Sequence, residues 1–310
     1  MQQVYILYHK KCSDGFGSAY AAWRHFQHSA EYIAWGHNEP LPEFKTNSLI
    51  YFCDICPLRD ALLELRKLHH VIVIDHHSTA LKDIGDLPDC HIDLTHSGSV
   101  LTWQFFHQAP MPKFLKYIEL RDLFAFNEEE KIICDAVYSY PLDFQIWLDE
   151  LENGFDYTKF KELGMAIRNA YNVQISFATQ AIITLAMKGH LIPAINVKDN
   201  VSDLGNLLCK MFPDAKFAAL FSLDVNNNWA FSLRSIGNFD VAELAKSFGT
   251  NGGGHKNSSG FKVPFDALQE SITGFNISDS LKNSLINAYL INSRDMDKIY
   301  IMPNVYSCQK

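Results

Sequence analysis

Short apolar runs alternate with amphipathic segments along the first third of the chain. Strands are predicted by apolar, partly β-branched runs over residues 4–9, 31–35, 49–54 and 71–75. Helical spacing of apolar residues predicts helices over 13–26 and 57–69, the second of which is opened by Pro57. Near-continuous apolar strands that alternate with helices are typical of a parallel sheet covered on both faces. The pattern therefore predicts an α/β fold whose N-terminal sheet is doubly wound and mainly parallel.

From about residue 97 the pattern becomes helical and then returns to strands. Helices are predicted over 97–108 and 112–124, followed by an Ala/Ile/Leu-rich helical stretch over 157–188 with Gly164 as its weak point. After Gly189, strands and helices are predicted over 191–197, 201–212, 216–225, 229–235 and 239–248. The chain is therefore expected to form a first domain over 1–126, a helical insertion and linker over 127–189, and a smaller C-terminal α/β domain over 190–310.

Composition and charge narrow the function classes. The chain of 310 residues is 47% hydrophobic and carries a net charge of −8, and it contains no apolar run of the ~20 residues needed to span a bilayer. Without a signal-peptide pattern at its start, cytoplasmic residence is the expectation, with no membrane partner. An acidic chain lacks the basic field of a protein that tracks long nucleic acid, so any nucleic-acid substrate is expected to be short.

Polar, metal-capable side chains follow three of the predicted strands. They are His9 with Cys12 and Asp14, then Asp54, and then Asp75, His76 and His77. Ligands of doubly wound sheets bind beyond the carboxyl ends of the strands. If these strands are neighbours, carboxylates and imidazoles converge on one site that suits Mn²⁺ or Mg²⁺ and a two-metal centre. Taken singly, a histidine such as His9 is more often a surface or satisfied core residue than a ligand, and Asp14 is as readily a helix cap.

Two further motifs contain residues that could bind a ligand or react. The tetrad Gly252, Gly253, Gly254 and His255 predicts a backbone nest for an anion, with His255 as an added donor, although a plain loop is the alternative. Cys53 and Cys56 form a CxxC motif, which leaves a redox role as a second alternative. The seven cysteines in all, an odd number without a secretion signal, favour reduced thiols.

The motifs together resemble the DHH phosphoesterase superfamily, and specifically its members with a C-terminal DHHA1 domain. The N-terminal signatures are "HKKCSDG", "CDI", "DHH" and "ELRD", and the C-terminal ones are "FSLRS" and "GTNGGGHKNSSGF". The "HxxCxDG" opening is most similar to the branch that includes nano-RNases, which degrade RNAs a few nucleotides long. The resemblance covers nearly the whole chain and implies a DHH domain followed by a DHHA1 domain.

The resemblance also implies roles for individual residues. One metal site would use His9 and Asp54, with Cys12 where many relatives place an aspartate. The second would use Asp14, Asp54, His76 and Asp122, so that Asp54 bridges two Mn²⁺ ions, with Mg²⁺ as an alternative cation. Asp75 would support the histidines and His77 would face the scissile phosphate. Phosphate binding in the second domain would fall to Arg234, Gly252, Gly253, Gly254 and His255.

The function implied is metal-dependent hydrolysis of short oligonucleotides by two-metal activation of water. Alternative substrates are 3′-phosphoadenosine 5′-phosphate and cyclic or linear dinucleotides, which present similar phosphates. From another class, a nucleotide-binding regulatory protein weakened in catalysis by Cys12 fits the same residues. The partner is then a short oligonucleotide or nucleotide phosphate, and a homodimer is compatible with the sequence.

Overall fold

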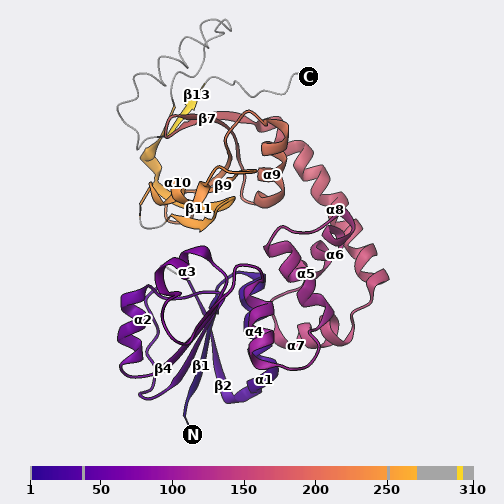
Figure 1. Ribbon diagram of the computed structural model, residues 1–310. Coiled ribbons are helices and arrows are strands. Elements are labelled where there is room, and N and C mark those ends of the chain that lie inside the picture. Colours follow the sequence, from indigo (N-terminus) through magenta and orange to yellow (C-terminus); the bar gives the residue numbers. More distant parts are fainter. Residues whose placement is uncertain (1, 37–38, 250–251, 271–298, 303–310) are drawn as a thin grey trace, which may run out of the picture. The chain divides into compact units, whose positions relative to one another are not determined.

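The chain folds into two compact units, each with its own sheet (Figure 1). The computed structural model describes residues 2–36, 39–249, 252–270 and 299–302. The units divide between Ala170 and Tyr171, within helix α8 (Tyr157–Ala178). Within the described residues, every helix is too short or too polar to cross a bilayer.

The first unit is built on a five-stranded sheet in which every pair of neighbours is parallel. Its strand order is β2-β1-β3-β4-β5, which places a topological switch point between β1 and β3. The predicted α/β fold with a parallel N-terminal sheet is confirmed. The strands are β1 (Val4–His9), β2 (Ala30–Trp35), β3 (Leu49–Cys53), β4 (His70–Asp75) and β5 (Cys90–Ile92).

Helices cover both faces of this sheet because alternate strand residues point to opposite sides. Leu7, Phe52 and Val73 pack on one face with residues of α2 (Arg59–Arg66) and α3 (Ser78–Ile84). On the other face, the cluster that contains Ile6, Tyr51, Cys53, Ile72 and Ile74 includes residues of α1 (Ser13–Phe26) and α4 (Gly98–Phe106). A short 3₁₀ turn, η1 (Gln27–Ser29), links α1 to β2. The sheet is doubly wound, as the continuous apolar runs predict.

A group of helices follows α4 and packs around an aromatic core. α6 begins where the side chain of Asn127 accepts from the backbone N–H of Glu130 and the Glu130 carboxylate accepts in return from the backbone N–H of Asn127. Aromatic rings fill this core, and the buried ones include Tyr20, Trp103, Phe114, Trp147 and Phe160. The elements are α5 (Lys113–Asp122), α6 (Glu128–Tyr138), α7 (Phe144–Ile146), the π-helix η2 (Trp147–Asn153) and α8.

Gly164 fixes the close approach of α8 to α6. A Cβ at this position would lie 1.9 Å from the carbonyl oxygen of Ile132 on α6. We expect Gly164→Ala to lower the free energy of unfolding of the first unit by roughly 2 kcal/mol, because the overlap outweighs the better helix propensity of alanine. Urea unfolding followed by circular dichroism measures the change. A stability equal to or above that of the parent would contradict this packing.

The second unit contains a mixed sheet of eight described strands in the order β10-β11-β9-β8-β7-β6-β13-β12. α9 (Val201–Met211) packs on one face through Leu204 and Leu208, and α10 (Val241–Lys246) packs on the other through Val241 and Ala245. The 3₁₀ turns are η3 (Thr179–Ala181) and η4 (Phe265–Ala267). The strands are β6 (Ile183–Met187), β7 (His190–Asn196), β8 (Ala218–Leu223), β9 (Asn228–Arg234), β10 (Gly253–His255), β11 (Ser258–Pro264), β12 (Leu268–Glu270) and β13 (Ile299–Met302).

The long helical stretch predicted to reach Lys188 is wrong beyond Ala178. Residues 183–187 form β6, which pairs with β7 in an antiparallel hairpin. Lys188 and Gly189 form the turn with φ angles of 46° and 76°, the left-handed pair of a two-residue hairpin. The Ala/Ile/Leu composition suits either element, and the hairpin partner decides between them.

Candidate metal centre

Side chains from the ends of β1, β3 and β4 meet at the carboxyl edge of the first sheet, beside its switch point. Asp54 follows β3 directly with a φ of 60°, a left-handed conformation that aspartate tolerates better than most residues. Its Oδ2 lies 3.5 Å from Nδ1 of His9, and its Oδ1 lies 3.1 Å from Nε2 of His76. The structure therefore brings together three of the residues that the sequence singles out.

Two more carboxylates reach the same place from helices. Nε2 of His76 lies 3.7 Å from Oδ2 of Asp14, near the start of α1, and 3.5 Å from Oδ2 of Asp122, the last residue of α5. Asp14, Asp54 and His76 are buried, with exposed fractions of 0%, 1% and 3%. Asp122 could not be chosen from sequence spacing, because only the packing of α5 brings it to the sheet.

The donor set fits divalent cations. The ligand atoms of His9, Cys12 and Asp54 lie within 4.8 Å of one another, and so do those of Asp14, Asp54 and His76. Asp54 is common to both groups. Among the described residues, neither carboxylate oxygen of Asp54 nor Oδ2 of Asp122 receives a well-formed hydrogen bond, although all three are buried. Buried oxygens in this state are costly unless a charge neutralises them.

The electrostatics of the protein alone show the strain of so many acids in one place. Burial and the neighbouring Asp54 raise the pKa of Asp14 to about 6. Burial, Asp14 and Asp54 raise the pKa of Asp122 to about 8. Burial would also raise the pKa of Asp54, but the rings of His76 and His9 lower it below its ordinary range. Like charges at this spacing favour cation binding because a cation relieves their repulsion.

Asp75 holds the two histidines that follow it. Its Oδ1 accepts from the backbone N–H groups of His76 and His77 at 2.7 and 3.1 Å, and it lies 2.7 Å from Nδ1 of His77. Burial alone would lower the pKa of His77, but the contact with Asp75 raises it to about 10. The arrangement fits a supporting role for Asp75 and a fixed imidazole at position 77.

The N-terminus of α4 anchors Asp14, a role that the spacing of residues in the sequence does not indicate. Oδ2 of Asp14 accepts from the backbone N–H of Gly98 at 2.6 Å, and Oδ1 accepts from the backbone N–H and the hydroxyl of Ser99. Glu119 on α5 steadies the same loop by accepting from the backbone N–H of Ser97 at 3.3 Å. The corresponding sequence signal is "SGS" at the start of a helix, where small residues leave the first backbone N–H groups open to an anion.

Cys12 stands where a harder ligand would suit Mn²⁺ better. Burial and the nearby carboxylates of Asp54, Asp14 and Asp122 raise the pKa of its thiol well above the usual range. We expect Cys12→Asp to bind Mn²⁺ roughly 10-fold more tightly, because carboxylate oxygen suits this cation and thiol sulfur does not. Isothermal titration with Mn²⁺ measures the change, and Cys12→Ser serves as the control for loss of sulfur alone. An unchanged affinity in Cys12→Asp would show that residue 12 is not a ligand.

Arg234 lies at the end of β9 in the second unit. Its Nη1 donates to the carbonyl oxygen of Leu233 at 2.9 Å and its Nη2 donates to Oγ of Ser202 at 3.0 Å. A Cβ on Gly205 of α9 would lie 2.5 Å from Cγ of Arg234, so the helix packs closely on the arginine stem. These contacts fix the direction of a guanidinium, the group best matched to phosphate oxygens.

The three glycines before His255 do not share one role. A Cβ on Gly252 would lie 2.0 Å from the carbonyl oxygen of Ala245, and Gly254 has a φ of 133° against the backbone of β11. Gly252 is therefore required by the close approach of the chain to α10, and Gly254 by the hairpin of β10 and β11. A Cβ on Gly253 would meet no described atom within 4 Å. Gly253 is thus the position in the tetrad whose missing side chain leaves space for a ligand.

The cysteines of the CxxC motif lie in an environment that disfavours redox chemistry. Cys53 is fully buried on β3, and burial raises the pKa of its thiol to about 12. Burial and the adjacent Asp75 raise the pKa of Cys56 even further. Reactive cysteines need the opposite shift, because the thiolate is the nucleophile. The motif instead supplies Asp54, which lies between its two cysteines.

Known proteins resemble the chain in sequence and in structure. A family model of the DHHA1 domain matches residues 191–276. Uncharacterized protein R106 of Acanthamoeba polyphaga mimivirus is 31% identical over 300 residues, covering 86% of this chain and 70% of that protein. A 3′,5′-cyclic-nucleotide phosphodiesterase of Helicobacter pylori is 39% identical over 88 residues, covering 28% of this chain and 23% of that protein.

Among solved structures, an exopolyphosphatase-related protein from Bacteroides fragilis aligns with a TM-score of 0.44 and 15% identity, covering 94% of this chain and 93% of that one.

The DHHA1 match falls on the second unit, downstream of the His and Asp cluster that contains the "DHH" triplet. The chain therefore belongs to the DHH family of phosphoester hydrolases that carry a C-terminal DHHA1 domain.

Proposed function

We propose that the chain is a metal-dependent phosphodiesterase that hydrolyses short oligonucleotides with two divalent cations. One observation carries the proposal: Asp54 belongs to both groups of potential ligands, His9 with Cys12 and Asp14 with His76. A shared carboxylate is the arrangement that holds two cations a few ångströms apart, as two-metal hydrolysis requires. Mn²⁺ suits the mixture of imidazole and carboxylate, and Mg²⁺ is the alternative.

The roles of the residues follow from their positions. His9, Cys12 and Asp54 would hold one cation, and Asp14, Asp54, His76 and Asp122 the other. The bound cations would supply Lewis-acid activation of water and neutralise charge that develops on the phosphate. His77, held through Nδ1 by Asp75, would present its other ring nitrogen to a phosphate oxygen. The backbone donors of Gly98 and Ser99 keep Asp14 in place throughout.

The second unit would bind the phosphate or nucleotide end of the substrate. Arg234 offers an oriented guanidinium, and Gly253 with His255 offers open backbone and a ring donor. A site that binds the end of a substrate favours short oligonucleotides, which are rich in ends, over a long strand. The net charge of −8 supports the same conclusion, because long nucleic acid would be repelled.

A substrate panel with purified protein and Mn²⁺ tests the proposal. It compares RNA and DNA of two to five nucleotides with long single strands, cyclic dinucleotides and 3′-phosphoadenosine 5′-phosphate. A 3′,5′-cyclic mononucleotide is added because one relative is named for that activity. We expect the highest kcat/KM on two- to five-nucleotide substrates, and no turnover after chelation.

Each other outcome rejects the proposal in a different way. Exclusive activity on long strands would overturn the short-substrate assignment. Preference for a cyclic mononucleotide or a dinucleotide would move the activity to those substrates. Tight nucleotide binding without turnover, with fewer than two Mn²⁺ ions bound per chain, would establish the regulatory alternative. Cys12 would then be the residue to test first as the cause of the missing cation.

A further inference from the structure

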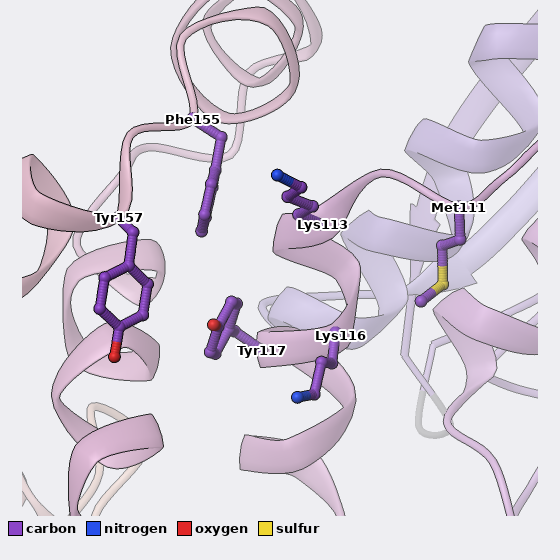
Figure 2. A pocket seen from close by; sticks show the side chains of 6 residues that line it. All are labelled: Met111, Lys113, Lys116, Tyr117, Phe155 and Tyr157. Carbon is purple, nitrogen blue, oxygen red and sulfur yellow. The ribbon is translucent and has the colours of Figure 1, made fainter.

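A cavity of about 530 Å³ lies in the helical part of the first unit, away from the candidate ligands. One wall comes from the first half of α5 and from Met111, two residues before it, and the other comes from Phe155 and the first residue of α8, Tyr157 (Figure 2). The volume falls in the range of small-molecule sites, about 300–1,000 Å³. The lining residues are Met111, Lys113, Lys116, Tyr117, Phe155 and Tyr157.

Aromatic rings make up half of this lining. Tyr117 and Phe155 stack with ring centroids 5.8 Å apart and an interplanar angle of 13°. The side chain of Tyr157 is 42% exposed, so part of its ring is open to a ligand. Met111 adds a polarizable apolar side chain. Exposed aromatic faces beside a cavity are suited to stacking on a flat aromatic ligand such as a nucleobase.

Two lysines give the cavity a positive side. Figure 2 shows the ammonium ends of Lys113 and Lys116 directed toward the aromatic side chains. Lys116 pairs with Glu130 at 3.2 Å, whereas Lys113 makes no hydrogen bond or ion pair within the part of the chain that the structure describes. Three rings alone would suit a quaternary ammonium ion. The lysines exclude that occupant and favour an anion.

We propose that this cavity is a second nucleotide site, which binds a nucleoside phosphate with its base on Tyr157 and Tyr117 and its phosphate at Lys113. The lining offers aromatic rings for a flat base and lysines for an anionic group. A nucleoside phosphate carries both a base and an anion. The site needs neither the metal centre nor the second unit. It shares only α5 with the metal centre, because Asp122 ends the helix that Lys113 begins.

Binding of adenosine 5′-monophosphate to metal-free protein tests the site. The titration uses an Asp54→Asn background in EDTA, so that the candidate metal centre contributes nothing, with adenosine and inorganic phosphate as separate probes. We expect the nucleotide to bind at least 10-fold more tightly than either fragment. Lys113→Glu and Tyr157→Ala, both at exposed positions, should each weaken it about 10-fold. Lys67→Glu, at the residue that follows α2, makes the same charge change at an exposed lysine and should leave binding unchanged.

Photolabelling with 8-azidoadenosine 5′-monophosphate separates this site from any nucleotide site in the second unit. We expect labelled peptides that contain Tyr117 or Tyr157, and loss of that label in Lys113→Glu. Label confined to peptides of the second unit would overturn the proposal, and so would nucleotide binding that Lys113→Glu and Tyr157→Ala leave intact. Because every measurement is made without metal, absence of hydrolytic activity would reject the proposed function and leave this site untouched.

Discussion

Asp54→Asn is expected to abolish Mn²⁺-dependent phosphodiester hydrolysis, with a fall in kcat/KM on the order of 10³ or more. Asparagine keeps the shape of the side chain but removes the negative charge that both groups of potential ligands share. Each cation would lose a ligand at once, and Asp14 and Asp122 cannot replace it because both are already proposed ligands of one of the two cations. The measurement is steady-state kinetics on a two-nucleotide substrate, together with Mn²⁺ stoichiometry.

The matched control for this substitution is Asp60→Asn. Asp60 is exposed on α2 and lies outside both groups of potential ligands, so the same chemical change there should leave kcat/KM within twofold. Thermal unfolding gives a second readout, since a cation that binds only the folded state stabilises it by mass action. Retention of the full Mn²⁺-induced rise in Tm by Asp54→Asn would remove Asp54 from the ligand set.

Gly98→Ala is expected to lower kcat/KM about 100-fold while the fold is retained. The added Cβ would lie 2.6 Å from Cβ of Asp54, 2.8 Å from its Oδ1 and 3.0 Å from Oδ2 of Asp14. The added Cβ would overlap with two candidate ligands, so at least one of these side chains must move to remove the overlap. Displacements near 1 Å in an active site cost about this factor. Alanine also favours the helix that Gly98 begins, so α4 should still form.

Two measurements separate displacement of ligands from unfolding. In EDTA, the circular dichroism spectrum of Gly98→Ala should match that of the parent, and its Tm should lie within a few degrees of the parent's. Its affinity for Mn²⁺ should fall. Gly36→Ala is the control substitution, because the nearest described atom to its Cβ would be Cδ of Glu39 at 3.7 Å, an ordinary contact. Parent-like activity in Gly98→Ala would mean that the start of α4 can shift to accommodate the Cβ and does not position the two carboxylates.

The sequence predicted the first unit well because its signals are local. Continuous apolar runs located the β1, β3 and β4 strands, and the groups that end them, His9, Asp54 and His76, do converge. The prediction of a helix over residues 183–187 was wrong because that segment is decided by its hairpin partner, which lies outside any local window.

Tertiary packing explains what the sequence could not locate. Asp122 reaches the site only because α5 packs against the sheet helices, and it was implied by a resemblance to relatives and not by spacing. Gly98 and Ser99 act through backbone N–H groups, which every residue type but proline carries. The glycines before His255 are equivalent in sequence, yet Gly252 packs against α10, Gly254 belongs to the β10–β11 hairpin, and a Cβ on Gly253 would meet no described atom within 4 Å.

The order of the candidate ligands along the chain bears on how the protein is made. All of them lie between His9 and Asp122, and α5 completes the set before the first residue of the second unit, Tyr171. N-terminal domains fold first during synthesis. The ribosome thus delivers every proposed metal ligand before it begins the second unit, to which we assign phosphate binding. Cation loading can precede translation of Arg234, so the newborn protein would acquire its reactive centre before it acquires the means to choose a substrate.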